Sequence, residues 1–69
     1  MEQTELQRVI EAILFAAGEP VEVSRLSMVL EVDEDEIIAA TDALSNELAF
    51  NRRGIRVIKL EKRYQMVSS

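Results

Sequence analysis

The hydrophobic pattern of this 69-residue chain changes period once, at the segment Asn51-Arg52-Arg53-Gly54. Before that segment, apolar residues recur every three or four positions, as they do in helices that bury one face. Beyond it, two short runs of β-branched and long apolar residues lie on either side of a charged turn at Glu61-Lys62-Arg63 and predict a β-hairpin. The pattern therefore restricts the fold to a helical part followed by a small C-terminal hairpin.

The first helix is expected over residues 4–17. Thr4 and Gln7 have the spacing of a capping box, with Thr4 as the cap. Gly18 stands where helices commonly end in a left-handed residue, and Pro20 prevents continuation. The apolar stripe of this helix comprises Leu6, Val9, Ile10, Ile13, Leu14 and Ala17.

Two more helices are expected after a short extended segment at 21–23. Ser24 is a candidate cap for a helix over residues 25–31, which turns Leu26, Val29 and Leu30 inward. Asp33 opens the third helix, which runs to about residue 50, and Glu36 completes a capping pair with it. The buried face of the third helix comprises Ile37, Ala40, Thr41, Leu44 and Leu48.

The first hairpin strand carries apolar residues on both faces. Ile55 and Val57 share one face, whereas Ile58 and Leu60 share the other. Either a bulge shifts the register, or protein covers both faces. The predicted order is α-β-α-α-β-β, which is mainly α with a small β-hairpin (α+β). We interpret residues 1–69 as one winged-helix domain.

The residue types argue against an enzyme. The chain has no His and no Cys, and its two glycines cannot form a phosphate-binding loop. No spacing pairs a nucleophile with a base, so we expect no catalytic residue and no cofactor. The acids at 33–36 do not make a calcium loop, because Ile37 and Ile38 stand where that loop needs an oxygen ligand and a glycine. We therefore expect no metal site.

The charges are segregated along the chain. Residues 52–63 contain six bases and the single acid Glu61, a balance of +5, while the rest has two bases and twelve acids, a balance of −10. The third helix carries acids and no base, which opposes its docking into the DNA major groove. The wing remains a candidate for electrostatic contact with DNA, with a solvated hairpin or an acidic protein partner as the alternatives. Its bases are Arg52, Arg53, Arg56, Lys59, Lys62 and Arg63.

Several apolar side chains exceed what one small core needs. Phe15 lies roughly opposite Leu6 on the first helix, and it is covered either by the wing or by a partner. The full set of candidate residues for a dimer or partner interface is Phe15, Ile38, Phe50, Ile58 and Leu60. No apolar run approaches the roughly 20 residues that cross a bilayer, and no basic signal segment follows Met1. We therefore expect a cytoplasmic protein.

Residues 10–26, from Ile10-Glu-Ala-Ile-Leu-Phe through Gly18-Glu-Pro20 to Leu26, resemble the start of segregation and condensation protein B. Gly54-Ile-Arg-Val-Ile and Tyr64-Gln65 are similar to that family's wing. The resemblance implies the first of two winged-helix domains and a homodimer. In the full-length protein it implies association with the kleisin subunit and the structural-maintenance-of-chromosomes (SMC) ATPase of the nucleoid-associated condensation complex. The predicted function is thus a non-enzymatic interaction module for chromosome condensation and segregation, and the competing hypothesis is a DNA-binding regulator that uses its wing.

Overall fold

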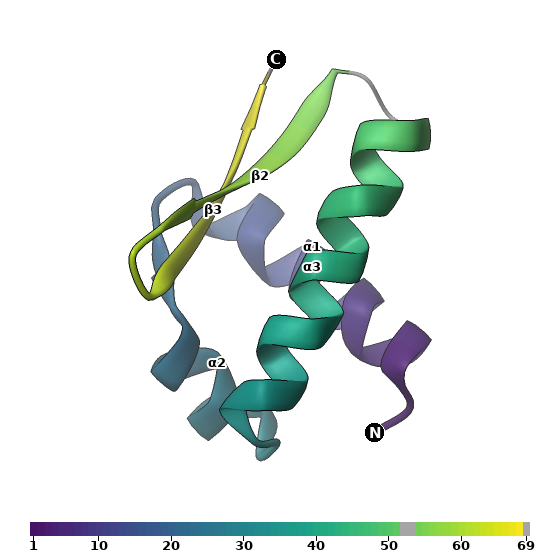
Figure 1. Ribbon diagram of the computed structural model, residues 1–69. Helices are drawn as coiled ribbons and strands as arrows, with labels where there is room; N and C mark the ends of the chain where they lie inside the picture. The colour runs from purple at the N-terminus through teal and green to yellow at the C-terminus, as the bar shows by residue number, and fades with distance from the viewer. Residues whose placement is uncertain (52–53, 69) are drawn as a thin grey trace.

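The computed structural model describes residues 1–51 and 54–68, and it has the predicted order of elements (Figure 1). The elements are α1 (Gln3–Ala17), β1 (Val21–Glu22), α2 (Val23–Leu30), α3 (Glu34–Asn51), β2 (Ile55–Leu60) and β3 (Arg63–Ser68). In Figure 1, α1 passes behind α3, and the hairpin lies in front of the C-terminal half of α1. The prediction of a winged-helix arrangement is confirmed.

The three strands form one antiparallel sheet in the order β1-β3-β2. Strands β2 and β3 pair without interruption from Ile55↔Ser68 to Leu60↔Arg63. The hairpin therefore has no bulge, which was one of the two alternatives for its apolar pattern. The turn between them has two residues, Glu61 and Lys62, and Glu61 adopts a left-handed φ of 59°. Hairpin turns of this length need positive φ, which glycine usually supplies. The turn therefore has two residues rather than the three predicted, and Arg63 is the first residue of β3.

The core lies where the three helices meet the inner face of the hairpin. Each helix contributes its periodic stripe, as predicted for Leu6, Ile10 and Leu14 on α1. Thr41 is buried within this core, and its hydroxyl donates to the Ile37 carbonyl at 2.7 Å. The fully enclosed apolar cluster comprises Leu6, Ile10, Leu14, Val23, Leu26, Ile37, Ala40, Leu44, Leu48 and Tyr64.

The N-terminal caps differ from those predicted. At α1, the Glu2 carboxylate accepts from the N–H groups of Thr4 at 2.9 Å and Glu5 at 3.3 Å. Thr4 is already inside the first turn, so the capping box centred on it is wrong. At α2, Ser24 is not the cap either, because the helix begins at Val23, two residues earlier than predicted. The N–H of Val23 donates to the Lys62 carbonyl at 2.9 Å, so the hairpin turn supplies the acceptor that a capping side chain otherwise gives.

One predicted core residue of α2 is wrong. Val29 is 60% exposed, whereas Val23 and Leu26 are buried and Leu30 packs against the core. On a helical wheel Val29 lies about 90° from the middle of the stripe formed by those three residues. Glu31 then ends α2 in the left-handed region at φ 57°, and the Ser27 carbonyl accepts from the N–H groups of Glu31 and Val32. This turn places α2 and α3 in the expected helix-turn-helix.

Within the described ranges, no helix combines the length and the apolar character needed to cross a membrane.

Two neighbouring residues of α1 provide a test of this packing. Leu14 is 1% exposed and Phe15 is 73% exposed. We expect Leu14→Ala to lower the free energy of unfolding by about 2–5 kcal/mol, because the substitution opens a cavity in the core. We expect Phe15→Ala to change it by about 0.5 kcal/mol or less. Urea denaturation of both variants at low protein concentration checks this, and equal destabilisation would contradict the assigned face of α1.

Candidate functional site

An open groove separates α1 from the open end of the hairpin. It consists of two adjoining depressions that share Phe15, Ile55 and Met66, with volumes of about 350 and 190 Å³. The pairing register places Ile55 and Met66 on the inner face of the hairpin. Phe15 stands at the rim, so the wing does not cover it. We call this surface the Phe15 groove; it is lined by Arg8, Glu11, Ala12, Phe15, Ile55, Met66, Val67 and Ser68.

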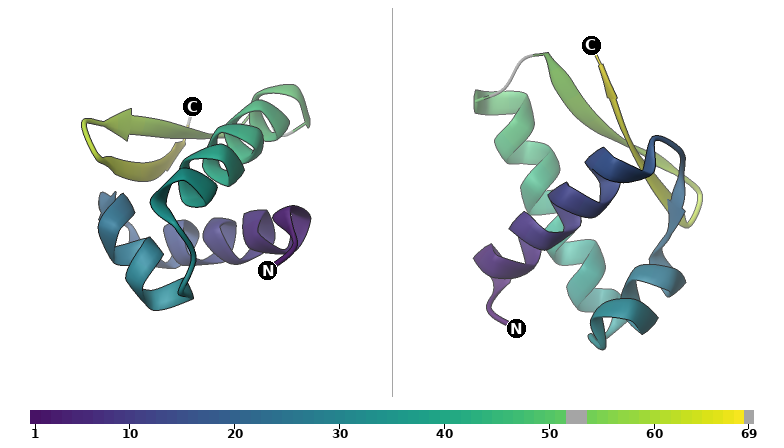
Figure 2. Two further views of the ribbon diagram at one scale, coloured as in Figure 1. Left: turned by 60° about the horizontal axis from the view of Figure 1, so that its bottom comes forward. Right: turned by 180° about the vertical axis from the view of Figure 1, so that it is seen from behind.

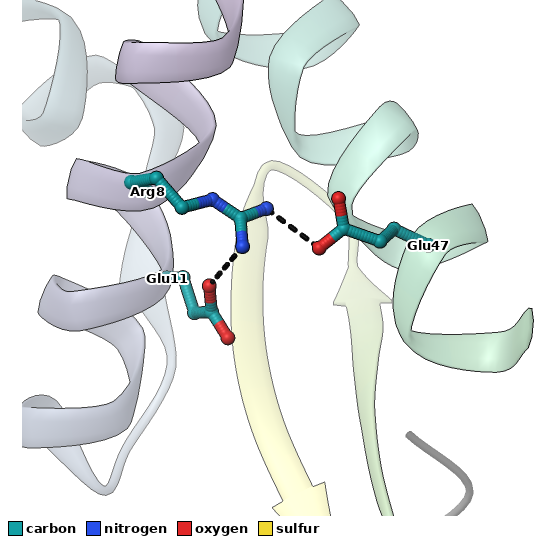
Figure 3. A network of polar contacts seen from close by, with 3 residues as sticks. All are labelled: Arg8, Glu11 and Glu47. Atoms are coloured by element: carbon teal, nitrogen blue, oxygen red, sulfur yellow. Dashed lines mark hydrogen bonds and ion pairs between the residues drawn. The ribbon is translucent and has the colours of Figure 1, made fainter. Parts of the chain in front are cut away.

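The polar end of the groove is an ion-pair network that ties α1 to α3 (Figure 3). The Arg8 guanidinium contacts Glu11 Oε1 at 3.0 Å through one nitrogen and Glu47 Oε2 at 2.7 Å through the other. The Arg8 side chain is 41% exposed, so water screens the network and each pair contributes at most about 1 kcal/mol. The two ion pairs hold the Arg8 guanidinium towards Glu11 and Glu47. It is therefore directed away from the apolar end of the groove, around Phe15.

The outer face of the hairpin carries a second group of apolar side chains, which are interspersed with Arg56, Gln65 and Arg63. Ile58 and Leu60 point away from the helices, and the alternation along β3 places Val67 on the same face. Ile58 and Val67 are half-buried and Leu60 is 44% exposed. No helix of the described chain lies over this face (Figure 2, left). The chain itself therefore covers only one of the two faces that the sequence pattern marks as apolar.

The remaining interface candidates differ in exposure. Phe50 is 83% exposed near the C-terminal end of α3, which keeps it available to a partner. Ile38 is half-buried and packs against the core, so the expectation that it lies off the core is wrong. Sequence reasoning missed Met28 and Val29 of α2, which are 72% and 60% exposed. On a helical wheel Met28 lies on the side of α2 opposite the buried stripe, so its spacing in the sequence could have identified it as exposed.

The wing bases that the structure describes are accessible. Arg56, Lys59, Lys62 and Arg63 are all exposed, and none of the four has an ion pair within the described chain. Lys59 Nζ lies 6.0 Å from the centroid of the Tyr64 ring, a weak cation–π contact. Arg52 and Arg53 lie outside the described residues. No group of three or more acidic side chains in residues 1–51 and 54–68 is arranged to hold a metal ion.

Tyr64 anchors the hairpin in the core. Its side chain is 2% exposed, and its hydroxyl makes no hydrogen bond of standard geometry with the described residues. Burial raises the pKa of Tyr64 above its usual value of about 10, and the nearby Asp42 carboxylate of α3 raises it further. The neutral phenol is thus the form that fits this position.

Comparison with known proteins identifies the family. The model of the family described as segregation and condensation complex subunit ScpB matches residues 8–69. The chain belongs to the ScpB family. It is 38% identical over 66 residues to segregation and condensation protein B of Alkaliphilus oremlandii, covering 96% of this chain and 36% of that relative. The relative from Clostridioides difficile is 34% identical over 71 residues, covering 100% and 40%. The chain thus spans about two fifths or less of the length of these ScpB relatives.

Solved ScpB structures have the same fold. One is a crystal structure of a dimer of the ScpB N-terminal domain complexed with a ScpA peptide. It superposes with a TM-score of 0.88 at 30% identity, covering 96% of this chain and 83% of that one. ScpB from Mycobacterium tuberculosis superposes with a TM-score of 0.90 at 25% identity, covering 100% of this chain and 43% of that one. The resemblance drawn from the sequence is confirmed at the level of family and fold.

The Tyr64 environment predicts a measurable titration. Tyr64 is the only tyrosine and there is no tryptophan, so absorbance near 295 nm reports this phenol alone. We expect its ionisation midpoint to lie above pH 10. Since the folded-state pKa is raised, the stabilisation by the neutral phenol is present below pH 10 and is lost as pH rises through that pKa. Asp42→Asn should lower the midpoint, and Glu34→Gln, at the far end of α3, should leave it unchanged. A wild-type midpoint at or below 10 would contradict the burial.

Proposed function

We propose that the chain is a homodimerisation and protein-interaction domain, without catalytic activity, of an SMC–kleisin complex that condenses and segregates chromosomes. In this proposal it is the first of two winged-helix domains, acts at the nucleoid in the cytoplasm, and takes part in holding the kleisin ScpA. The observation that carries the proposal is the pair of surfaces that expose apolar side chains, the Phe15 groove and the outer face of the hairpin, on a member of the ScpB family.

The energetics of these surfaces support association. Burying an exposed aromatic or leucine side chain contributes about 1.5–3 kcal/mol, and aromatic residues dominate many interfaces. Phe15 and Phe50 are the only phenylalanines, and both are largely exposed. A chain that leaves both outside its own core has them available for a contact between proteins.

The related crystal structure supports the choice of partners. In that protein the N-terminal domain is a dimer complexed with a ScpA peptide. The sequence resemblance placed kleisin binding in the full-length protein, whereas the related complex contains the N-terminal domain. We therefore propose that this domain contributes directly to kleisin binding.

Dimerisation has a matched test. We expect light scattering to report a dimer for the wild-type chain at micromolar concentration. Phe15→Glu and Leu60→Glu should each shift the mass towards the monomer, because each places a charge on a surface that the dimer would bury. Val29→Glu is the control: Val29 is 60% exposed on α2 and lines neither the Phe15 groove nor the outer face of the hairpin, so this variant should stay dimeric. A monomeric wild type would overturn the dimer proposal.

DNA binding through the wing is the second candidate function, since the four described wing bases are exposed and free of ion pairs. The acidic first turn of α3, Glu34, Asp35 and Glu36, is also exposed and opposes contact between that helix and phosphates. We therefore propose that the wing bases contribute little to the affinity of this domain for DNA.

One fluorescence anisotropy experiment separates the two functions. We expect a labelled ScpA segment to bind the chain near physiological salt and a labelled DNA duplex to show no binding above background. At low salt, any DNA binding should fall steeply as salt rises and should disappear when Arg56, Lys59, Lys62 and Arg63 are replaced by Ala. Micromolar DNA binding near physiological salt, without ScpA binding, would favour the DNA-binding function.

A further inference from the structure

Strand β3 has an unpaired edge beside the Phe15 groove. On one side β3 pairs with β2 along its whole length, but on the other side β1 covers only Arg63 and Tyr64. Residues 18–20 connect α1 to β1 and are not part of the strand. Gln65 to Ser68 therefore have no strand beside them on that side, as the upper part of β3 in Figure 1 shows.

The direction of the free backbone groups follows from one hydrogen bond. The Lys62 carbonyl accepts from Val23, so it points towards β1. Backbone groups alternate sides along a strand, so those of Tyr64, Met66 and Ser68 point the same way. The groups of Tyr64 face its pairing partner Val21. The N–H and C=O groups of Met66 and Ser68 then point away from β2, in the plane of the sheet, and no strand of the described residues pairs with them.

This edge lacks the features that protect sheet edges from pairing. Natural edges are commonly shielded by charged side chains, proline or a bulge. The segment Tyr64-Gln65-Met66-Val67-Ser68 has no charge, proline or glycine, and the β2–β3 register has no bulge. The opposite edge, strand β2, carries the exposed charges of Arg56 and Lys59. The two edges thus differ in chemistry, and only the β3 edge suits another strand.

We propose that the β3 edge pairs with the β3 edge of a second copy of this chain, antiparallel and with a two-fold axis at Val67. Self-pairing suits such an edge, because each copy supplies the same donors and acceptors. With the axis at Val67, Met66 faces Ser68 of the second copy and the outward groups of both residues form hydrogen bonds. The inference rests on the proposed dimer and names its contact.

The pairing accounts for the apolar residues nearby. It joins the two three-stranded sheets into one, and the two Val67 side chains meet on the outer face, each directly opposite Arg56 and diagonal to Ile58 of its own copy. The Phe15 groove, which includes Met66, Val67 and Ser68, adjoins the same edge. Phe15 thereby lies next to the second copy, where an aromatic side chain can stabilise the contact between the two copies.

Ser68→Pro tests the strand contact with little effect on the monomer. Ser68 is exposed and its N–H points to the free edge, so proline removes no bond between β2 and β3. We expect Ser68→Pro to raise the dimer dissociation constant by about tenfold or more, since it removes one donor from each copy. Ser68→Ala keeps the N–H and should match the wild type. The measurements are sedimentation equilibrium for mass and circular dichroism for the fold.

A charge exchange at Val67 tests the position of the axis. Val67→Lys and Val67→Glu should each weaken the dimer, because like charges would meet across the axis. An equimolar mixture of the two variants should restore a dimer of one copy of each, which native mass spectrometry resolves. A mixture that stays monomeric overturns the pairing about Val67.

The outcomes separate this contact from the dimer itself. A monomeric wild type overturns both the proposed dimer and the strand pairing. A dimeric wild type that Ser68→Pro leaves unchanged keeps the dimer and overturns the strand pairing. If Ser68→Pro weakens binding of the ScpA segment but leaves the dimer intact, the edge belongs to ScpA and our choice of occupant is wrong.

Discussion

Apolar burial between α1 and α3 is the contact on which the rest of the structure depends. The stripe Leu6, Ile10 and Leu14 packs into one cluster with residues such as Ile37 and Leu44, all close to zero exposure. The chain has no disulfide to help, since it contains no cysteine. Helix α2 and the hairpin then attach to this cluster through Leu26 and Tyr64. The Arg8 network between α1 and α3 orients the helices at the surface and adds little energy.

The small size of that cluster has a consequence for function. Once the helices and the inner face of the hairpin are packed, Phe15, Phe50 and Leu60 have no place inside. A domain this small buries a smaller share of its surface than a larger one does, so some apolar side chains must remain outside. Phe15 borders the groove at the open end of the hairpin, and Leu60 lies on the outer face near its turn. Exposed side chains of this size are available for contacts with a partner.

The charge distribution opposes docking of α3 into the major groove of DNA. The helix that would enter the major groove begins with Glu34, Asp35 and Glu36, and four bases lie on the hairpin. In an assembly, the exposed hairpin cations and the acidic helix surface can orient partners, with apolar contacts supplying most of the affinity. Membership of the ScpB family agrees with an interaction role of this kind.

The sequence by itself determined the order of the elements and most of the core, because one-sided burial imposes a local period that can be read directly. Ile37, Leu44 and Leu48 were identified in this way, as was the end of α1 at Gly18, with its φ of 66°. Only the tertiary structure decided which face of the hairpin is covered and that Phe15 stays exposed. It also decided that the Lys62 carbonyl receives the first N–H of α2, and that β1 stops short of Met66. Each of these depends on contacts between segments far apart in the chain, and no local spacing of residues records where such segments meet.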